Sequence, residues 1–327
     1  MSTRSTHGLP SRPSGKRPVH LFPGQGDFSV TSLVRAVRTA DVVRDAVGEV
    51  FGELDGIAAE HDLPLLAARL LGSRPPGTRE LAEAPAGTLQ LAAYGASVAV
   101  HRALSRVYGP PAAVVGVSFG EIAAVAAAGV LTVADGARAA LDLAQVLAFC
   151  PGGLTVLGCP EEQAGRLLAV AGAADTVVAV VNDDRSVVVS GPHADLVRVE
   201  KTAEELGVSA VRLRLPFSSH HPALAPQAEA FATLLRAYPW SKARCPVFSA
   251  VARRSYLPDD DPRLGLADCL VKPAVVPAVL HQLHTCRPDM LLEAGTGDAL
   301  ATSARRVLDP CGGPPVHAPL TDLDFAW

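Results

Sequence analysis

The feature that most constrains this chain is a serine held midway between two glycines, in Gly116-Val117-Ser118-Phe119-Gly120. The segment follows a short apolar run and precedes an alanine-rich stretch. This pattern is typical of a nucleophile elbow, a sharp strand-to-helix turn that leaves the serine hydroxyl exposed at the helix N-terminus. A serine so placed is a candidate nucleophile for an acyl-enzyme. The motif alone does not identify an activity, because small residues recur by chance.

Two further motifs flank this serine at a distance. Phe-Pro-Gly-Gln-Gly occupies 22–26, and the pair Ser219-His220 lies well downstream. In this order and spacing, the three motifs resemble those of the malonyl-CoA:acyl-carrier-protein transacylase family. That family includes the acyltransferase domains and the discrete, trans-acting acyltransferases of polyketide synthases. The resemblance runs from about Val19 to about Leu308 and includes three smaller matches: Thr88-Leu89-Gln90, Val181-Asn182 and Glu293-Ala294-Gly295-Thr296-Gly297.

Apolar spacing predicts an α/β protein with a change of character after residue 150. Helical spacing dominates 30–107 and 122–149, with a turn at Gly129, whereas strands and helices alternate from 151 onward. The strands predicted for a parallel sheet lie at 18–22, 112–115, 247–249 and 290–292. The inserted segment has strands at 154–157, 176–181, 186–190 and 209–215, with helices at 161–171 and 193–206. Two β-α-β units of this length suggest a ferredoxin-like subdomain.

These elements predict three parts. Residues 1–17, rich in Ser, Arg and Pro, form a flexible tail. Residues 18–150 and 216–327 form a large α/β-hydrolase-like catalytic domain with a parallel sheet. Residues 151–215 form the inserted ferredoxin-like subdomain. The catalytic cleft is expected between the two folded parts.

Composition excludes several classes of protein. Hydrophobic residues make up 49% and charged residues 19%, which indicates a globular chain. A net charge of −4 argues against a nucleic-acid binder. No signal peptide or membrane-spanning run is apparent, so we expect a reduced cytoplasmic enzyme that contacts no membrane. The cysteines lack C-x-x-C spacing, which supports neither a metal site nor a disulfide framework; they are Cys150, Cys159, Cys245, Cys269, Cys286 and Cys311.

Ser118 needs a base, because a free serine hydroxyl is a poor nucleophile. His220 stands where the family has its catalytic histidine, and His221 is the rival for that role. The resemblance implies that a main-chain carbonyl orients this histidine, and the matching residue is Cys269. It also implies an oxyanion hole made of the backbone amides of Gln25 and Phe119.

Two departures from the family pattern bear on the substrate. Val117 replaces the histidine that usually precedes the serine. Enzymes of the family that use malonyl groups carry an arginine on the helix after the elbow, where it pairs with the substrate carboxylate. Leu143 occupies the aligned position, and a leucine cannot pair with a carboxylate. A slip in register would bring Arg138 there instead.

The acyl pocket is therefore expected to take a group without a second carboxylate. Two serines beside the base leave room in it, whereas the Phe119 side chain is expected to take some away. The residues assigned to the pocket are Gln90, Val117, Leu143, Asn182, Phe217 and Ser219.

The acceptor implied by the resemblance is an acyl carrier protein, whose recognition helix is typically acidic. A polyketide synthase loading module is a further candidate partner. Electrostatic complementarity would mainly speed the encounter. No cofactor is expected beyond the phosphopantetheine or CoA that carries the substrate. The candidate contacts on the cleft rim are Arg212, Arg214, Arg253, Arg254, Arg305 and Arg306.

The sequence thus predicts a discrete acyltransferase that works by ping-pong through an acyl-serine. Its acyl group would be a starter, aminoacyl or peptidyl unit. A proofreading hydrolase of the same fold, a malonyl-type transferase and an inactive carrier-binding scaffold remain open. An α/β-hydrolase shares G-x-S-x-G, but Gly-Gln-Gly near the start and the inserted subdomain disfavour it. The sequence leaves the acyl group, its donor, the oligomeric state and the product undetermined.

Overall fold

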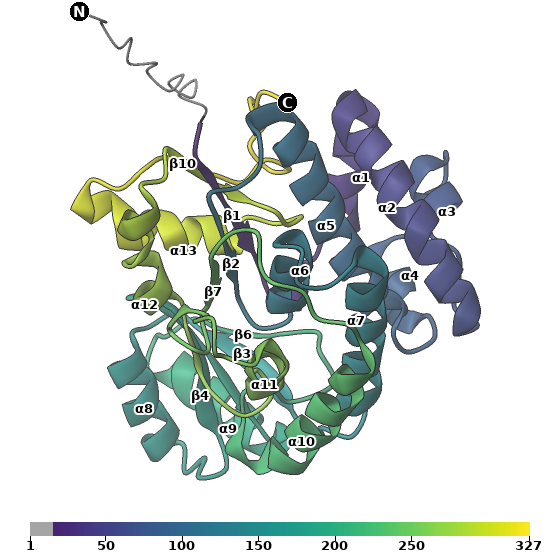
Figure 1. Cartoon of the computed structure of the whole chain (residues 1–327). Coiled ribbons are helices and arrows are strands. Elements are labelled where there is room, and N and C mark those ends of the chain that lie inside the picture. Colours follow the sequence, from purple (N-terminus) through teal and green to yellow (C-terminus); the bar gives the residue numbers. More distant parts are fainter. Residues whose placement is uncertain (1–15) are drawn as a thin grey trace, which may run out of the picture.

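The computed structural model describes residues 16–327 and contains two sheets, a larger one and a smaller one below it (Figure 1). Most of the expected tail, residues 1–15, lies outside the described residues. Arg17, its last residue, is bound to the body of the protein. Its amide donates to the Asp289 carboxylate at 2.8 Å, and its guanidinium donates to the Cys286 carbonyl. Arg17 was expected to belong to the tail, but these bonds attach it to the body of the protein.

The larger sheet is built of short apolar strands whose central members are buried on both faces. In the described chain it has six strands in the order β11-β10-β1-β2-β7-β8, all parallel except the edge strand β8. Parallel sheets need helices on both faces, which explains why these strands lack polar alternation. The strands are β1 (Pro18–Phe22), β2 (Ala113–Gly116), β7 (Val247–Ser249), β8 (Arg254–Ser255), β10 (Met290–Glu293) and β11 (Val316–His317).

Helices lie on both sides of this sheet: in Figure 1, α5, α6 and α7 lie to its right, and α12 and α13 lie to its left. The helix predicted at 122–149 is two helices, separated by a turn at Gly129, where φ is +77°. The helices of this part are α1 (Val30–Thr39), α2 (Asp41–Glu60), α3 (Ala67–Leu71), α4 (Thr78–Glu83), α5 (Thr88–Tyr108), α6 (Gly120–Ala127), α7 (Val133–Leu147), α10 (Ala225–Leu234), α11 (Pro262–Asp268), α12 (Val276–Leu280) and α13 (Ala299–Leu308).

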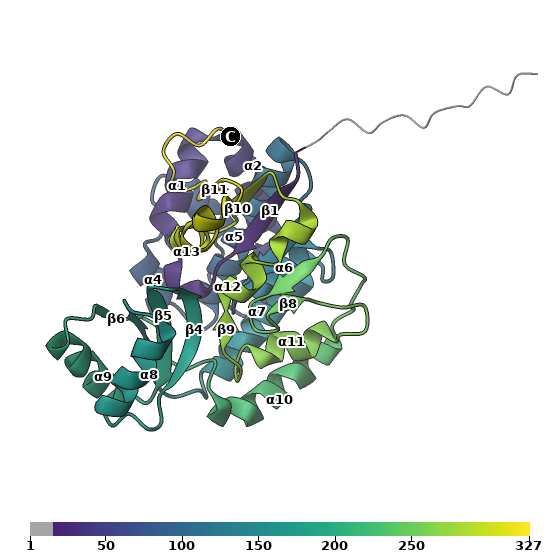
Figure 2. The same cartoon turned by 90° about the vertical axis from the view of Figure 1, so that its left-hand side faces the viewer.

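The smaller sheet has the strand-helix order of a ferredoxin-like subdomain, β-α-β-β-α-β, and lies at the lower left of Figure 2. Its five strands in the described chain run in the order β6-β3-β5-β4-β9. The fifth, β9, comes from outside 151–215 and pairs in parallel with β4. The elements are β3 (Gly153–Leu157), α8 (Glu161–Val170), β4 (Val177–Asp183), β5 (Ser186–Gly191), α9 (His193–Glu205), β6 (Ala210–Arg212) and β9 (Ala274–Val275).

One strand is shorter than predicted, and this matters for the site. The strand expected at 209–215 spans only Ala210–Arg212, although the Leu213 amide still donates to the Leu154 carbonyl of β3 at 2.9 Å. Residues 213–220 form neither a helix nor a strand. Within residues 16–327, no helix has both the length and the hydropathy that crossing a bilayer requires.

Candidate active site

The strand-to-helix turn between β2 and α6 places Ser118 in the left-handed region, with φ of +55°. The flanking glycines are required by close approach. A Cβ on Gly120 would overlap the carbonyl oxygens of Phe22 and Pro23, and one on Gly116 would lie 2.6 Å from the Glu121 Cα. Strained backbone of this kind persists only where the surroundings enforce it. The elbow predicted from the sequence is thus built by its two glycines.

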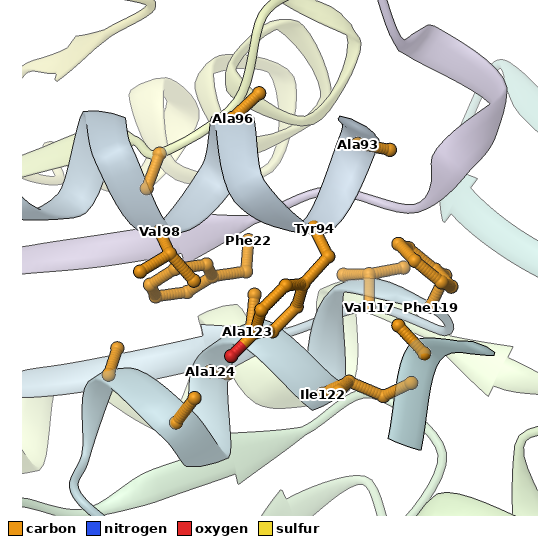
Figure 3. Close-up of a cluster of buried hydrophobic side chains, with 14 of the residues drawn as sticks. Phe22, Ala93, Tyr94, Ala96, Val98, Val117, Phe119, Ile122, Ala123 and Ala124 are labelled. Atoms are coloured by element: carbon orange, nitrogen blue, oxygen red, sulfur yellow. The ribbon is translucent and has the colours of Figure 1, made fainter. Parts of the chain in front are cut away.

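The residues on either side of Ser118 anchor the elbow in the core. Val117 and Phe119 belong to a buried apolar cluster that includes Tyr94 and Ile122 (Figure 3). The apolar residue in place of the family's histidine is therefore accommodated by packing. Phe119 does not line the cavity in front of Ser118, so the expectation that its side chain narrows the acyl space is wrong.

His220 is placed against the serine, although the two residues lie in distant segments. Its Nε2 is 2.7 Å from the Ser118 Oγ, and its Nδ1 is 2.8 Å from the Lys272 carbonyl oxygen. A carbonyl only accepts, so in the neutral ring Nδ1 carries the proton and donates it to Lys272. Nε2 is then the acceptor for the Ser118 hydroxyl. This is the geometry that a general base for the serine requires.

The residue that orients His220 differs from the one expected. Cys269 was the expected source of the carbonyl, but that carbonyl belongs to Lys272, three residues further along. After α11 ends, the amides of Val271 and Lys272 both donate to the Asp268 carbonyl, and this turn brings Lys272 to the histidine. Cys269 instead places its Sγ 3.8 Å from the Ser118 carbonyl oxygen.

Burial lowers the pKa of His220 to about 4, and the bond to Lys272 offsets only part of this effect. The ring is 1% exposed, so the charged form loses most of its hydration. His220 is therefore neutral near pH 7 and able to accept a proton. Its φ of +56° means that it, too, lies in the left-handed region.

The neighbouring His221 is occupied elsewhere. Its Nδ1 accepts from the Ala223 amide at 3.2 Å, and its Nε2 donates to the Asp175 carbonyl at 3.0 Å. Both nitrogens are therefore used in capping the short 3₁₀ helix Pro222–Leu224 and in holding a loop. Of the two candidate bases, the structure brings His220 to the serine.

Two backbone amides are available as an oxyanion hole. Among residues 16–327, neither the Gln25 amide nor the Phe119 amide has a hydrogen-bond acceptor. The turn that carries Gln25 lies beside the elbow, since a Cβ on Gly24 would lie 3.8 Å from the Ser118 Cβ. Donors left free beside a nucleophile are what a developing oxyanion needs. The side-chain oxygen Oε1 of Gln25 accepts a hydrogen bond from the side-chain Nε2 of Gln90 at 3.2 Å.

Ser118 and His220 open into a cavity of about 420 Å³. Of the predicted pocket residues, Val117, Asn182 and Ser219 line it. Gln90 and Phe217 line a neighbouring cavity instead, and Leu143 is buried in the core and lines neither. The expectation that these three line one pocket with the serine is therefore wrong.

Most of the apolar wall of this cavity was not predicted from the sequence. Residues two apart on β3 and on β5 face it, as do two residues on β4. This is the period of side chains on one face of a sheet, so alternation in the inserted subdomain was the available signal. The apolar residues that were not predicted include Leu154, Val156, Val180 and Val188 from the sheet and Leu300 from α13. Ser186 and Ser303 line the cavity too, as does Arg306, which was expected at the rim as a carrier contact.

Charged groups in this cavity do not favour a second carboxylate. Its only basic Lys or Arg side chain within the described residues is that of Arg306, which pairs with the buried Asp183 at 3.1 Å. Asp27 and Asp298 line the same cavity. Arg138 pairs with Glu60 and Asp135 and does not line the cavity, which excludes the register slip.

Four of the six arginines proposed for the carrier are held in ion pairs. Arg212 pairs with Glu200, Arg254 with Asp260, and Arg306 with Asp183. Arg305 lies 3.5 Å from Asp322. No salt bridge within residues 16–327 involves Arg214 or Arg253, and both are exposed.

The buried carboxyl group of Glu121, at the start of α6, ties the elbow to neighbouring segments. Glu121 accepts from the Ser249 hydroxyl at 2.7 Å and from the Tyr256 hydroxyl at 2.9 Å. Burial raises its pKa to about 7. Its partners come from β7 and from the segment after β8, far away in the sequence, so no local motif indicates this role.

Comparisons with known proteins show the family to which this chain belongs. The model of the acyl transferase domain family matches residues 24–264, a range that includes Gln25, Ser118 and His220. The spectinabilin polyketide synthase system protein NorA' of Streptomyces orinoci is 34% identical over 210 residues, which is 63% of this chain and 6% of that protein. The chain thus spans only a small part of the curated relatives it matches.

Solved structures give the same result. A malonyl-CoA:acyl carrier protein transacylase of Xanthomonas oryzae is 25% identical, with a TM-score of 0.81 over 95% of this chain and 97% of that one. The acyltransferase domain of the iterative polyketide synthase in enediyne biosynthesis is 30% identical, with a TM-score of 0.59 over 70% of this chain and 60% of that one. With its serine and histidine so arranged, this chain belongs to the acyl transferase domain family and has the fold of malonyl-CoA:acyl carrier protein transacylases and polyketide synthase acyltransferase domains.

Proposed function

We propose that this chain is a discrete acyltransferase that moves a non-dicarboxylate acyl group onto an acyl carrier protein of a polyketide pathway. The observation that carries the proposal is the Ser118–His220 contact of 2.7 Å in a cavity without a free cation among the described residues. The six cysteines are unpaired, which fits the reducing cytoplasm we propose for it.

In the first half of the reaction, the Ser118 oxygen attacks the carbonyl carbon of an acyl thioester. His220 Nε2 takes the hydroxyl proton as the new C–O bond forms. The amides of Gln25 and Phe119 donate to the oxyanion of the tetrahedral intermediate. Collapse breaks the C–S bond, the leaving thiolate takes the proton from His220, and an acyl-serine ester remains.

In the second half, the phosphopantetheine thiol of a carrier protein attacks the ester carbonyl. His220 Nε2 takes the thiol proton and then returns it to the Ser118 oxygen as the C–O bond breaks. The Lys272 carbonyl accepts from Nδ1 throughout, so it stabilises the positive charge that His220 carries in each intermediate. The enzyme ends in its starting state.

The charges around the site support the proposed class of acyl group. A malonyl-type substrate would bring a carboxylate into a cavity that already contains Asp27 and Asp298. Arg306, the one arginine there among the described residues, is committed to Asp183. Burying an unpaired carboxylate costs roughly several kcal/mol, and this cost disfavours malonyl-type substrates. A starter, aminoacyl or peptidyl group does not carry this penalty.

For the carrier protein, Arg214 and Arg253 are the proposed first contacts. Both are exposed and free of ion pairs within the described chain, so an acidic helix can pair with them without breaking an internal bridge. The other four proposed arginines would have to exchange partners. Such rim charges are expected to affect the association rate more than the final affinity.

The test is intact-protein mass spectrometry of the enzyme with a panel of thioesters. The panel contains malonyl, acetyl, longer acyl and aminoacyl groups on CoA and on a carrier protein. Each is offered with and without a second carrier. Loading of Ser118 by a non-dicarboxylate, followed by its appearance on the second carrier, supports the proposal.

Two other outcomes would assign a different function. Release of the loaded group as free acid while a second carrier is present would make the chain a proofreading hydrolase. Loading by malonyl in preference to every other group would make it an extender-unit transferase and overturn the charge argument.

A further inference from the structure

The turn that follows α11 contacts both halves of the active site. The Lys272 carbonyl oxygen lies 2.8 Å from the Nδ1 of His220. Three residues earlier, the Cys269 Sγ lies 3.8 Å from the Ser118 carbonyl oxygen. The short segment 269–272 therefore touches both the ring of the base and the main chain of the nucleophile.

The carboxyl group of Glu121 binds this same turn. It is buried at the start of α6, in the first turn of the helix. Two hydroxyls, a thiol and a main-chain amide donate to it, and they belong to Ser249, Tyr256, Cys269 and Val251. A carboxylate offers about four lone-pair sites, so these donors use its whole acceptor capacity. The orientation of the Glu121 side chain is therefore fixed by its surroundings.

Tyr256 extends the contact between this carboxyl group and α11. Its hydroxyl donates to Glu121, and the same oxygen packs on the helix at Gly265, where a Cβ would lie only 2.1 Å away. No side chain larger than hydrogen fits there, so the hydroxyl and the helix are in direct contact. Gly265 and Cys269 lie one helical turn apart. One carboxyl group thus holds α11 and its C-terminal end at two points.

We propose that Glu121 is a positioning residue, which holds α11 and the turn after it at the distance from the elbow that brings His220 to Ser118. Glu121 does not line the cavity that contains the serine. It acts through its two contacts with α11 on the position of the Lys272 carbonyl, and that carbonyl orients the base. The inference goes beyond the proposed function, because it holds for any acyl group and depends only on the serine and the histidine reacting as a pair.

The way in which the base is oriented makes such a support necessary. A main-chain carbonyl has no rotamers, so the Lys272 oxygen moves only with the segment that carries it. A displacement of about 1 Å near reacting groups can cost about a hundredfold in rate. Protonation of Glu121 does not break the arrangement, because either of its hydroxyl partners can turn and accept the new proton.

The experiment measures phosphonylation of Ser118 by a small alkyl fluorophosphonate at pH 8. The serine oxygen attacks phosphorus, fluoride leaves, and His220 takes the hydroxyl proton. The reagent therefore reports on the pair without any acyl group or carrier protein. The maximal rate kinact, the half-saturation concentration KI and the thermal midpoint Tm are measured for each variant.

The variants change the contacts of Glu121 one at a time. Glu121→Gln keeps the shape of the side chain but adds two N–H donors, of which a turned hydroxyl accepts only one. Tyr256→Phe and Cys269→Ala each remove one donor toward α11, and Cys269→Ser restores a donor. Asp55→Asn is the control for lost stability, because this carboxylate on α2 accepts from the Leu66 amide at 2.6 Å and lines neither cavity.

We expect Glu121→Gln to lower kinact about tenfold or more and to leave KI within about twofold. Tyr256→Phe and Cys269→Ala should each lower kinact about threefold, and Cys269→Ser should regain most of the wild-type rate. Asp55→Asn should lower Tm and leave kinact unchanged. Tyr256→Phe loses a single oxygen atom, so it decides the matter if Glu121→Gln does not fold.

The results that would overturn the inference are distinct from failure of the proposed function. Variants that lower Tm without lowering kinact would make Glu121 a purely structural residue, as would an equal loss of kinact in Asp55→Asn. Both results leave the proposed acyl transfer intact. A wild-type enzyme that the reagent does not phosphonylate would show that Ser118 is not activated, and then both proposals fail.

Discussion

The elbow around Ser118 and the loop around His220 reach the same unusual backbone by different routes. Both residues have a φ near +55°, a conformation that costs energy for residues other than glycine. The elbow is held by neighbours in sequence: two glycines, and the Val117 and Phe119 side chains in the core. The loop is held almost entirely by segments far away in the sequence.

The contacts of the histidine loop show this dependence. The Ser218 amide donates to the Cys150 carbonyl at 2.9 Å, and its hydroxyl donates to the Pro151 carbonyl at 2.8 Å. On the other side, the His221 amide donates to the Leu270 carbonyl at 2.8 Å. The elbow that carries the nucleophile and the loop that carries the base should therefore differ in how strongly substitutions change their stability and the activity.

The largest effect should come from removing either half of the pair. Ser118→Ala and His220→Ala are each expected to lower kcat/KM for acyl transfer by about 10⁴-fold or more, because nucleophile and base act as one unit. The double variant should be no worse than either single one. An acyl-enzyme formed at the wild-type rate in Ser118→Ala would exclude this serine as the nucleophile. His221→Ala is the control and should retain activity, because its ring nitrogens face other groups.

The next effect tests how rigid the elbow is. Gly120→Ala should lower the free energy of unfolding by about 3 kcal/mol, because the new Cβ meets two backbone carbonyls that cannot move aside. Denaturant unfolding measures the change. Gly165→Ala on α8 is the matched control, since a Cβ there meets nothing within 4 Å. It should be neutral or stabilising. Equal stability of the two variants would show that the glycine pattern does not build the elbow.

The third prediction concerns the base. Burial lowers the pKa of His220 to about 4, so the neutral, active ring persists far below the usual titration of histidine. The single-turnover acylation rate should therefore change little between pH 8 and about pH 5 and then fall tenfold per unit below about pH 4. A decline centred near pH 6.5 would mean that the ring is solvated in solution. The same shift disfavours folding in acid, since the unfolded chain binds the proton first.

The contrast between the elbow and the loop also explains which parts of the fold and of the site could be predicted from the sequence. The elbow, the Gly-Gln-Gly turn and most strands of both sheets were predicted, because local patterns determine them. Strand 247–249 was predicted with the bounds that the structure has. The carbonyl that orients His220 was assigned to Cys269, because counting along a motif cannot show which residue of a turn faces a distant ring.

The cavity was predicted less well for the same reason. Leu143 and Phe217 were placed in the pocket by alignment with a family pattern, whereas most of its apolar wall comes from the inner face of the ferredoxin-like sheet. That face depends on how the inserted subdomain docks on the larger one. Long-range packing of this kind leaves no short motif in the sequence.

The smallest effect should come from removing one of the hydrogen bonds that hold the loop around His220. Ser218→Ala removes the hydroxyl that donates to Pro151 and leaves the other bonds of the loop in place. We expect a loss of about 1 kcal/mol in the free energy of unfolding and a fall in kcat of two- to fivefold with KM unchanged. The neighbouring Ser219→Ala is the matched control. Its hydroxyl faces the cavity and has no hydrogen-bond partner within residues 16–327, so stability should not change. A loss in Ser218→Ala as large as that in Gly120→Ala would mean that the histidine loop is as rigid as the elbow, and that the two halves of the site do not differ in how they are held.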